Sequence, residues 1–197
     1  MNLLEKASGC RSHRLLGVTE RAQMIAIREY DARWPSLFEE EARLLFAAFG
    51  SLAVRIEHVG STSVPGLAAK PVIDIQVSVA SLLPHGRYVD TMAALAYRHV
   101  ALADFDLVYP FFHKPPEWPS THHVHLCEAG GEQEWKHLAF RNHLRAHPEA
   151  ARQYEALKRE LAKVHSGSTP RSMEAYSLAK SEFVANVLRC AKVSGDA

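Results

Sequence analysis

The residues of this chain best suited to phosphate chemistry lie just after position 59. A glycine is followed there by three residues with hydroxyl side chains, and a lysine follows a few positions later. Glycine lets a ligand approach the backbone closely because it has no Cβ. Backbone amides and hydroxyl groups in such a loop can donate hydrogen bonds to phosphate oxygens. We therefore expect the phosphate-binding residues to include Gly60, Ser61, Thr62, Ser63 and Lys70.

An acidic residue interrupts the next segment, which otherwise has the pattern of a buried strand. Over residues 71–79 the apolar residues Ile73, Ile75 and Val77 alternate with polar ones, which predicts a strand with two different faces. A carboxylate at this place costs strand stability unless it is paired, hydrated or bound to a ligand. We expect Asp74 to be a catalytic residue that binds a divalent cation, Mg²⁺ or Mn²⁺, beside the phosphates. The simpler alternative is a solvated carboxylate.

A second cluster of candidate residues is a histidine-rich segment at 121–128. In an extended strand His123 and His125 share one face, and two imidazoles at this spacing can bind the same cation. With Asp74 they would form a metal site of Asp74, His123 and His125, and imidazole ligands favour Zn²⁺ or Mn²⁺ over Mg²⁺. Alternatively His125 acts as a general base or as a hydrogen-bond donor to phosphate. The histidines could also be half-buried strand residues bonded to the backbone.

Charged residues outside these segments supply further candidates. Glu57 precedes the loop and could assist proton transfer, or pair instead with Lys70 or Arg55. If the C-terminal helices bring their basic residues together, these form a basic wall over the loop that binds phosphate; otherwise they are solvated. The basic residues in question are Arg141, Arg145, Lys158 and Lys180, of which we expect Arg141 and Lys180 to bind phosphate. The histidines at 137, 143, 147 and 165 receive no role, because their spacing suits solvated helix faces.

The predicted strands and helices that position these residues indicate an α+β fold. We expect a mixed sheet flanked by helices, with a C-terminal helical segment. We expect strands over 24–28, 52–58, 71–79, 99–102, 107–113 and 122–128. We expect helices over 35–49, 90–98, 132–147, 148–165 and 169–192. The chain divides into a loosely ordered leader over 1–22, an α+β core over 23–130 and helices over 131–192 that pack on the core as a single domain.

Composition excludes several functional classes. The chain has 197 residues, 23 basic and 22 acidic, and a formal net charge of +1, so bulk charge does not favour nucleic-acid binding. No run of eighteen apolar residues could cross a membrane. The three cysteines, Cys10, Cys127 and Cys190, are too far apart for a disulfide framework or a zinc knuckle. The N-terminal segment lacks the features of a secretory signal, so we expect a cytoplasmic protein.

The segment that contains the loop and the acidic strand resembles the signature of the GrpB family. The resemblance rests on residues 56–67 and 69–75 and covers about residues 24–190. Further matches are Tyr30-Asp31 with Trp34-Pro35, the histidine strand, and Phe140-Arg141, Leu144-Arg145, Tyr154, Lys158, Tyr176 and Lys180 in the helical tail.

The resemblance implies a nucleotidyltransferase-like fold, and some members of the family are fused to dephospho-CoA kinase. By position, Gly60 and Ser61 would bind a triphosphate and Asp74 would bind the metal. The superfamily pattern has a second acid two residues after the first, where this chain has Gln76. Since two-metal transfer needs clustered carboxylates, this departure argues against full transferase activity.

Three functional hypotheses follow. The first is a nucleotidyltransferase-like protein that binds a nucleotide or another phosphorylated small molecule and transfers a nucleotidyl group with a divalent metal. The second is a catalytically silent binding module, associated by analogy with the coenzyme A pathway. The third is a metal-dependent hydrolase that uses the histidine strand. The sequence does not predict the oligomeric state.

Overall fold

The structure is a computed structural model that describes residues 25–101, 106–117, 119–165 and 170–195. The predicted leader over 1–22 lies outside the described residues. No helix in these described ranges is both long and apolar enough to cross a membrane.

A five-stranded mixed sheet forms the centre of the molecule. Its strands are β1 (Ala53–Val59), β2 (Ile73–Val79), β3 (Arg98–Val100), β4 (Phe111–Lys114) and β5 (His122–Glu128), in the order β1-β2-β5-β4-β3. The two central strands β2 and β5 run parallel, whereas the other neighbouring strands are antiparallel. Because β2 and β5 begin at the same edge of the sheet, Asp74 lies opposite His123 and Gln76 lies opposite His125.

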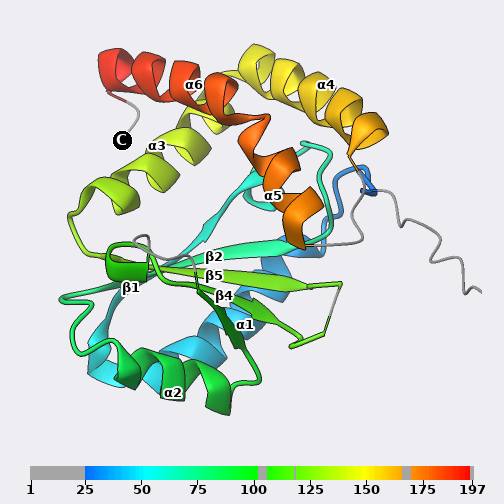
Figure 1. The fold of residues 1–197 in the computed structure, drawn as a ribbon. Helices are drawn as coiled ribbons and strands as arrows, with labels where there is room; N and C mark the ends of the chain where they lie inside the picture. Colours follow the sequence, from blue (N-terminus) through cyan, green and yellow to red (C-terminus); the bar gives the residue numbers. More distant parts are fainter. Residues whose placement is uncertain (1–24, 102–105, 118, 166–169, 196–197) are drawn as a thin grey trace, which may run out of the picture.

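Helices cover both faces of this sheet (Figure 1). On one face lie α1 (Trp34–Phe49) and α2 (Gly86–Ala94). On the other lie the four C-terminal helices, α3 (Glu132–Ala146), α4 (Pro148–Val164), α5 (Pro170–Leu178) and α6 (Ser181–Ser194). This arrangement confirms the predicted mixed sheet flanked by helices with a helical C-terminal segment.

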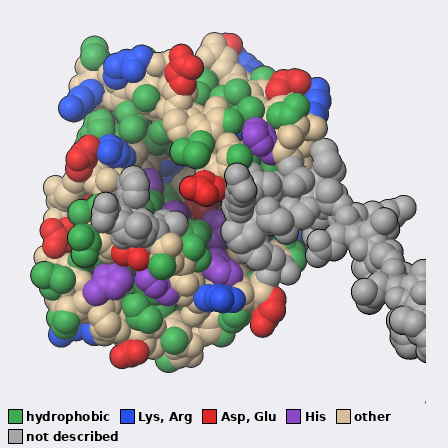
Figure 2. Space-filling model, viewed as in Figure 1, with side chains coloured by type: hydrophobic (Ala, Val, Ile, Leu, Met, Phe, Trp, Pro, Cys, Tyr) green, Lys and Arg blue, Asp and Glu red, His purple; other side chains and the backbone are tan. Residues whose placement is uncertain are grey.

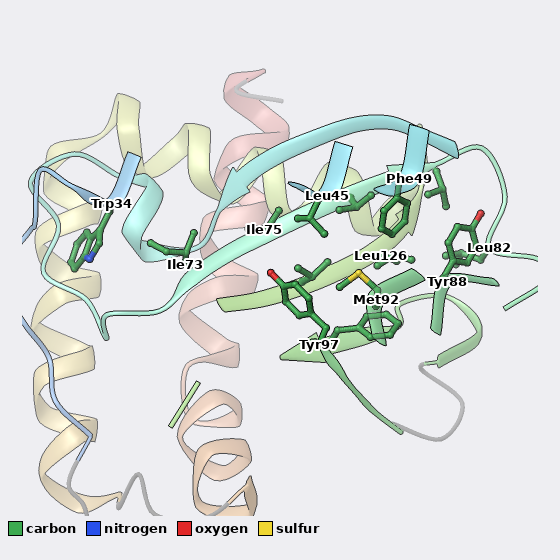
Figure 3. Close-up of a cluster of buried hydrophobic side chains, with 14 of the residues drawn as sticks. Trp34, Leu45, Phe49, Ile73, Ile75, Leu82, Tyr88, Met92, Tyr97 and Leu126 are labelled. Carbon is green, nitrogen blue, oxygen red and sulfur yellow. The ribbon is translucent and has the colours of Figure 1, made fainter. Parts of the chain in front are cut away.

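The main hydrophobic core lies between the sheet and the helices α1 and α2 (Figure 3). Ile75 of β2 packs there with Leu45 and Phe49 of α1 and with Met92 of α2, and all four are buried. Burying an aliphatic or aromatic side chain of this size contributes about 1.5–3 kcal/mol. The alternation in β2 therefore places its apolar residues toward α1 and its polar residues, Asp74 among them, toward the C-terminal helices.

Several predicted elements differ from those observed. The strand predicted over 24–28 is reduced to a single bridge between Arg28 and Ala69, because Ile25 and Ile27 pack against Ala162 of α4 and Tyr176 of α5. The helix predicted over 90–98 covers 86–94 instead, and the strands predicted over 107–113 and 99–102 cover 111–114 and 98–100.

The long C-terminal helix predicted over 169–192 is divided in two. It breaks between Leu178 and Ser181, and Lys180 becomes the residue that precedes the first turn of α6. Neither Gly nor Pro marks this break in the sequence. Its consequence is that Lys180 can turn toward the sheet instead of continuing along a helix surface.

Candidate functional site

The loop that follows β1 approaches Asp74 closely. Gly60 has a φ of 66° and a ψ of −168°, a backbone conformation that is essentially restricted to glycine. A Cβ at this position would lie 2.4 Å from Asp74 Oδ2. The loop and the acidic strand therefore meet in space, and glycine is required because the carboxylate occupies the place of a side chain.

Asp74 is held in its ionised form. Its Oδ1 accepts a hydrogen bond from His123 Nδ1 at 3.2 Å, and its side chain is 28% exposed. Burial by itself would raise the pKa of this carboxyl. The hydrogen bond from His123 and the charge of Lys70 are among the interactions that outweigh burial and lower the pKa to about 2.

Three lysine side chains interact electrostatically with this carboxylate. Burial lowers the pKa of Lys70, Lys158 and Lys180, to about 7 for Lys158 and about 8 for Lys180. The negative charge of Asp74 raises the pKa of all three lysines and so opposes the effect of burial. The lysines also act on one another: the charge of Lys180 lowers the pKa of Lys158, and the charge of Lys70 lowers the pKa of Lys180. The site thus holds more positive than negative charge, and each ammonium raises the cost of keeping the next one charged.

Two of these lysines lie over tyrosine rings. Lys158 Nζ lies 4.8 Å from the ring centroid of Tyr154, and Lys180 Nζ lies 4.3 Å from that of Tyr176. Both pairs have an i, i+4 spacing along the chain, and such cation–π contacts hold an ammonium in place without neutralising it. The tyrosines therefore fix the two lysines while leaving their charges available.

The basic residues of α3 and α4 converge on the loop after β1 and are not simply solvated on the helix surfaces, the other alternative that the sequence left open. Arg141 donates to the carbonyl oxygen of His58 at 3.0 Å, and Arg145 donates two hydrogen bonds to that of Ser63 at 3.0 and 2.6 Å. Lys158, only 2% exposed, donates to the carbonyl oxygen of Ala68. These three side chains hold the loop backbone, so we call Arg141, Arg145 and Lys158 the basic clamp.

Glu57 has a different partner from either of those expected. Its carboxylate forms an ion pair with Arg141 at 2.7 Å, whereas Arg55 pairs with Glu134 of α3 at 3.1 Å. Arg141, expected to bind phosphate, is thereby neutralised by Glu57. The ion pair of Glu57 and Arg141 joins α3 to strand β1 of the sheet.

The hydroxyl groups of the loop are also partly engaged. Thr62 donates to the carbonyl oxygen of Val72 at 3.2 Å and contacts His58 Nε2 at 3.0 Å, and Ser63 donates to the carbonyl oxygen of Gly60 at 2.6 Å. Both side chains are buried. Ser61, which hydrogen bonds with Tyr154, is more accessible. Of the three hydroxyls, that of Ser61 is best placed to reach a ligand.

Gln76 occupies the position where the superfamily has a second acid, and its side chain is held in a network of hydrogen bonds. Gln76 is 0% exposed, its Oε1 accepts from His137 Nδ1 at 2.9 Å, and its Nε2 donates to Ser78 Oγ at 3.3 Å. Tyr109 in turn donates to His137 Nε2. Burial lowers the pKa of His137 to about 4, so its ring is neutral and the network carries no charge. His137 and Tyr109 are central to the site although no sequence signal beyond their residue types pointed to them.

His125 lies within a row of aromatic rings. Its ring stacks on those of Tyr109 and Phe111, with centroids 4.9 Å apart in both cases. Burial lowers its pKa well below the usual value. His125 is therefore neutral and fixed between two rings, a position that favours a structural role over proton transfer.

The predicted metal ligands do not assemble into a metal site. Within the part of the chain that the structure describes, no three His, Cys, Asp or Glu side chains converge closely enough to hold an ion. Asp74 Oδ1 instead accepts a hydrogen bond from His123, and His125 is held by its aromatic neighbours. The expectation of a three-ligand site formed by Asp74, His123 and His125 is corrected accordingly.

Figure 2 shows a depression beneath the C-terminal helices, with histidine and acidic side chains gathered at its wall. Fold and site together define a mixed α/β protein. The loop after β1 and the C-terminal helices lie around Asp74 of β2, and several lysine side chains interact with this carboxylate.

Comparisons place this protein among known sequences. A sequence model of the family described as "GrpB protein" matches residues 24–189, and the chain belongs to the GrpB family. The crystal structure of the conserved protein GrpB from Enterococcus faecalis superposes with a TM-score of 0.72 at 35% sequence identity, over 84% of this chain and 96% of that one.

Two relatives differ in length from this chain. "UPF0157 protein YqkA" of Bacillus subtilis is 35% identical over 155 residues, which are 79% of this chain but 43% of that protein. A protein named "Dephospho-CoA kinase" from Mycolicibacterium paratuberculosis is 31% identical over 154 residues, 66% of this chain and 37% of its own length. The chain thus spans less than half of either protein.

Proposed function

We propose that this protein binds a phosphorylated small molecule, with nucleotides as the first class to test, beside the Gly60 loop, Asp74 and Lys180. The observation that carries the proposal is that the Gly60 loop lies against Asp74, while Lys70, Lys158 and Lys180 interact electrostatically with this carboxylate and repel one another. An anion would relieve this repulsion, and phosphate is the anion that lysine and hydroxyl groups most commonly bind together. Similarity to a protein named dephospho-CoA kinase supports a ligand related to nucleotides.

The donor set does not fit a resident metal. Asp74 Oδ1 accepts a hydrogen bond from His123 and Oδ2 lies against the Gly60 backbone, so one of the two oxygens is already engaged. At the next polar position of β2, Gln76 uses both ends of its amide within the protein. Two-metal transfer needs several carboxylates that point at the ions. We therefore propose binding without the divalent cation that the sequence predicted, and a binding module in preference to a nucleotidyltransferase or a metal-dependent hydrolase.

In this proposal the residues have distinct roles. Lys180 and Lys70 contact the phosphate, and Ser61 and the backbone at Gly60 donate hydrogen bonds to it. The basic clamp does not touch the ligand but keeps the loop in the shape that the ligand needs.

Thermal stabilisation by a panel of phosphorylated compounds tests the proposal. A ligand at one hundred times its Kd stabilises the native protein by about 2.7 kcal/mol. Lys180→Gln should weaken binding by about tenfold, the equivalent of about 1.4 kcal/mol. Lys192→Gln is the matched control, because Lys192 also lies over an aromatic ring, that of Trp135 at 5.6 Å, but on the far part of α6. Lys70→Gln provides a second test at the site.

The proposal fails if no phosphorylated compound raises the melting temperature, or if Lys180→Gln binds as tightly as Lys192→Gln. Release of pyrophosphate from a nucleoside triphosphate, abolished in Asp74→Ala, would contradict the view that the site binds without transfer.

A further inference from the structure

Strand β1 forms an open edge of the sheet. Among the described strands it pairs with β2 alone, and the opposite edge of the sheet is the short strand β3. The free N–H and C=O groups of an edge strand can pair with another chain, so natural edges commonly carry lysine or proline or are covered by another element. The sequence of β1, Ala-Val-Arg-Ile-Glu-His-Val, contains neither lysine nor proline. Its edge is therefore suited to pairing with a further strand.

The two ends of β1 restrict where such pairing can occur. At the first end a register shift leaves Val54 without a partner on β2, and regular pairing begins at Arg55. At the other end Arg141 of α3 donates a hydrogen bond to the carbonyl oxygen of His58. The part of the edge that is open to another strand is therefore centred on Ile56.

The charged side chains of β1 are complementary to a second copy of the same strand. Arg55 pairs with Glu134 of α3, and its side chain is 45% exposed. Glu57 pairs with Arg141 of the same helix and is 30% exposed. If two β1 strands pair antiparallel about a two-fold axis at Ile56, Arg55 of each copy lies opposite Glu57 of the other. An axis one residue to either side would place two arginines or two glutamates opposite one another, which is unfavourable.

An exposed aromatic side chain borders the same edge. Glu41 of α1 accepts a hydrogen bond from Lys114 of β4, so this flank of the helix faces β4. Phe46 lies about 140° around the helix from Glu41, on the flank toward β1, and it is 61% exposed. Val54 lies across the short turn that joins α1 to β1 and is 56% exposed. Both apolar side chains therefore flank the open edge.

We propose that the surface formed by the β1 edge over Val54–Glu57 and by Phe46 binds a second copy of this chain. The two β1 strands pair antiparallel about Ile56, and the two sheets continue into one another. The same two-fold axis brings the C-terminal part of one α1 toward the N-terminal part of the other. Phe46 of each copy then faces the region of the other copy where the ring of Phe38 stacks on that of His58, with centroids 4.8 Å apart. Dimer formation at this edge does not depend on the proposed ligand.

Three kinds of interaction hold the dimer together. Main-chain hydrogen bonds across the axis satisfy N–H and C=O groups that β1 presents to solvent in the single chain. The ion pairs that Arg55 and Glu57 make with α3 join into one network across the interface. Phe46 and Val54 lose exposed apolar surface in both copies, so each removal of such a side chain is felt twice.

Sedimentation velocity of the full chain over a wide range of concentrations tests the proposal, and we expect a monomer–dimer equilibrium. Phe46→Ser should weaken the dimer by at least about tenfold, because buried apolar surface is lost from both copies. Leu44→Ser is the matched control, since Leu44 is 50% exposed on the same helix. Leu44 lies about 60° from Glu41 on the flank toward β4, so its substitution should leave the dimer unchanged.

An exchange of charges tests the strand pairing itself. Arg55→Glu places two acidic side chains opposite one another, and Glu57→Arg places two basic ones there, so each variant alone should be monomeric. In an equimolar mixture the two variants carry opposite charges at the facing positions, and they should form a heterodimer. Far-ultraviolet circular dichroism checks that each variant keeps the fold, since each substitution also removes an ion pair with α3.

Several outcomes would overturn the dimer. A chain that sediments as a monomer at every concentration would do so, and would leave this edge to a different protein. A dimer that survives both Phe46→Ser and Arg55→Glu would place the interface elsewhere. Equal dissociation by Leu44→Ser and Phe46→Ser, or the lack of a heterodimer in the mixture of folded charge variants, would also contradict the pairing about Ile56.

Discussion

At the scale of single residues, the site is explained by one acidic side chain on the polar face of strand β2. Asp74 remains ionised because the hydrogen bond from His123 and the charge of Lys70 favour its charged form, against the effect of burial. Gly60 makes this possible by leaving the space that the carboxylate fills. The pair therefore acts as a unit, and a change at either residue should be felt at the other.

Gly60→Ala should destabilise the protein and weaken ligand binding. The new Cβ would meet the Asp74 carboxylate in a backbone conformation that alanine disfavours, so the free energy of unfolding should fall by about 2–4 kcal/mol. Gly66→Ala is the control, because Gly66 also has a positive φ, 78°, but no atom lies within 4 Å of the point that its Cβ would occupy. It should cost about 1–2 kcal/mol. Urea denaturation measures both, and equal losses would show that the contact with Asp74 is unimportant.

At the scale of elements, charged side chains join helices to the sheet on both of its faces. On the face of the C-terminal helices the basic clamp holds the loop after β1. On the other face Glu41 of α1, which is buried, accepts hydrogen bonds from Lys114 of β4 at 3.0 and 3.1 Å and from the Tyr97 hydroxyl at 3.0 Å. The carboxylate of Glu41 stabilises the fold mainly because its hydrogen-bond donors are present, since a buried charge without a partner is destabilising.

Glu41→Ala should lower the free energy of unfolding by about 3 kcal/mol, because it leaves Lys114 and Tyr97 without their shared acceptor. In a Lys114→Ala background the same substitution should cost at least about 1 kcal/mol less, as expected for residues in direct contact. A double-mutant cycle measured by urea denaturation gives this difference. Additive losses would mean that the ion pair does not couple α1 to β4.

At the scale of the whole molecule, the two helical layers depend on one sheet. The polar face of β2 is buried although it carries Gln76 and Ser78, because α3 supplies hydrogen-bonding partners such as His137. Without the C-terminal helices these groups and the loop backbone would lose their partners. We therefore expect the predicted core over 23–130 and the helices over 131–192 to behave as one packing unit.

The full chain should unfold in one cooperative transition. Far-ultraviolet circular dichroism reports on all helices, and fluorescence of Trp34, in α1, can be followed separately in a Trp118→Phe/Trp135→Phe variant. We expect coincident midpoints for both signals, because the two layers share the sheet. A chain that ends at residue 131 should show no cooperative transition. A separate, later transition of the core would contradict this view.

The sequence by itself determined most of the local structure and the centre of the site. The boundaries of β5 agree with the prediction, and α3 and α4 begin at the predicted residues and end within one residue of the predicted ends. The loop after Gly60 and the acidic strand were also predicted together. These features depend on alternation, helix periodicity and glycine, which act over a few neighbouring residues.

Tertiary structure decided which side chains meet. Nothing in the local pattern showed that Glu57 pairs with Arg141, that His137 hydrogen bonds to Gln76, or that the chain breaks before Lys180. Each of these contacts joins residues that are far apart in the chain or depends on how helices pack on the sheet. A sequence pattern sets the period of an element, but the partner of a polar side chain is chosen when layers pack and each buried group must find a hydrogen bond or a counter-charge.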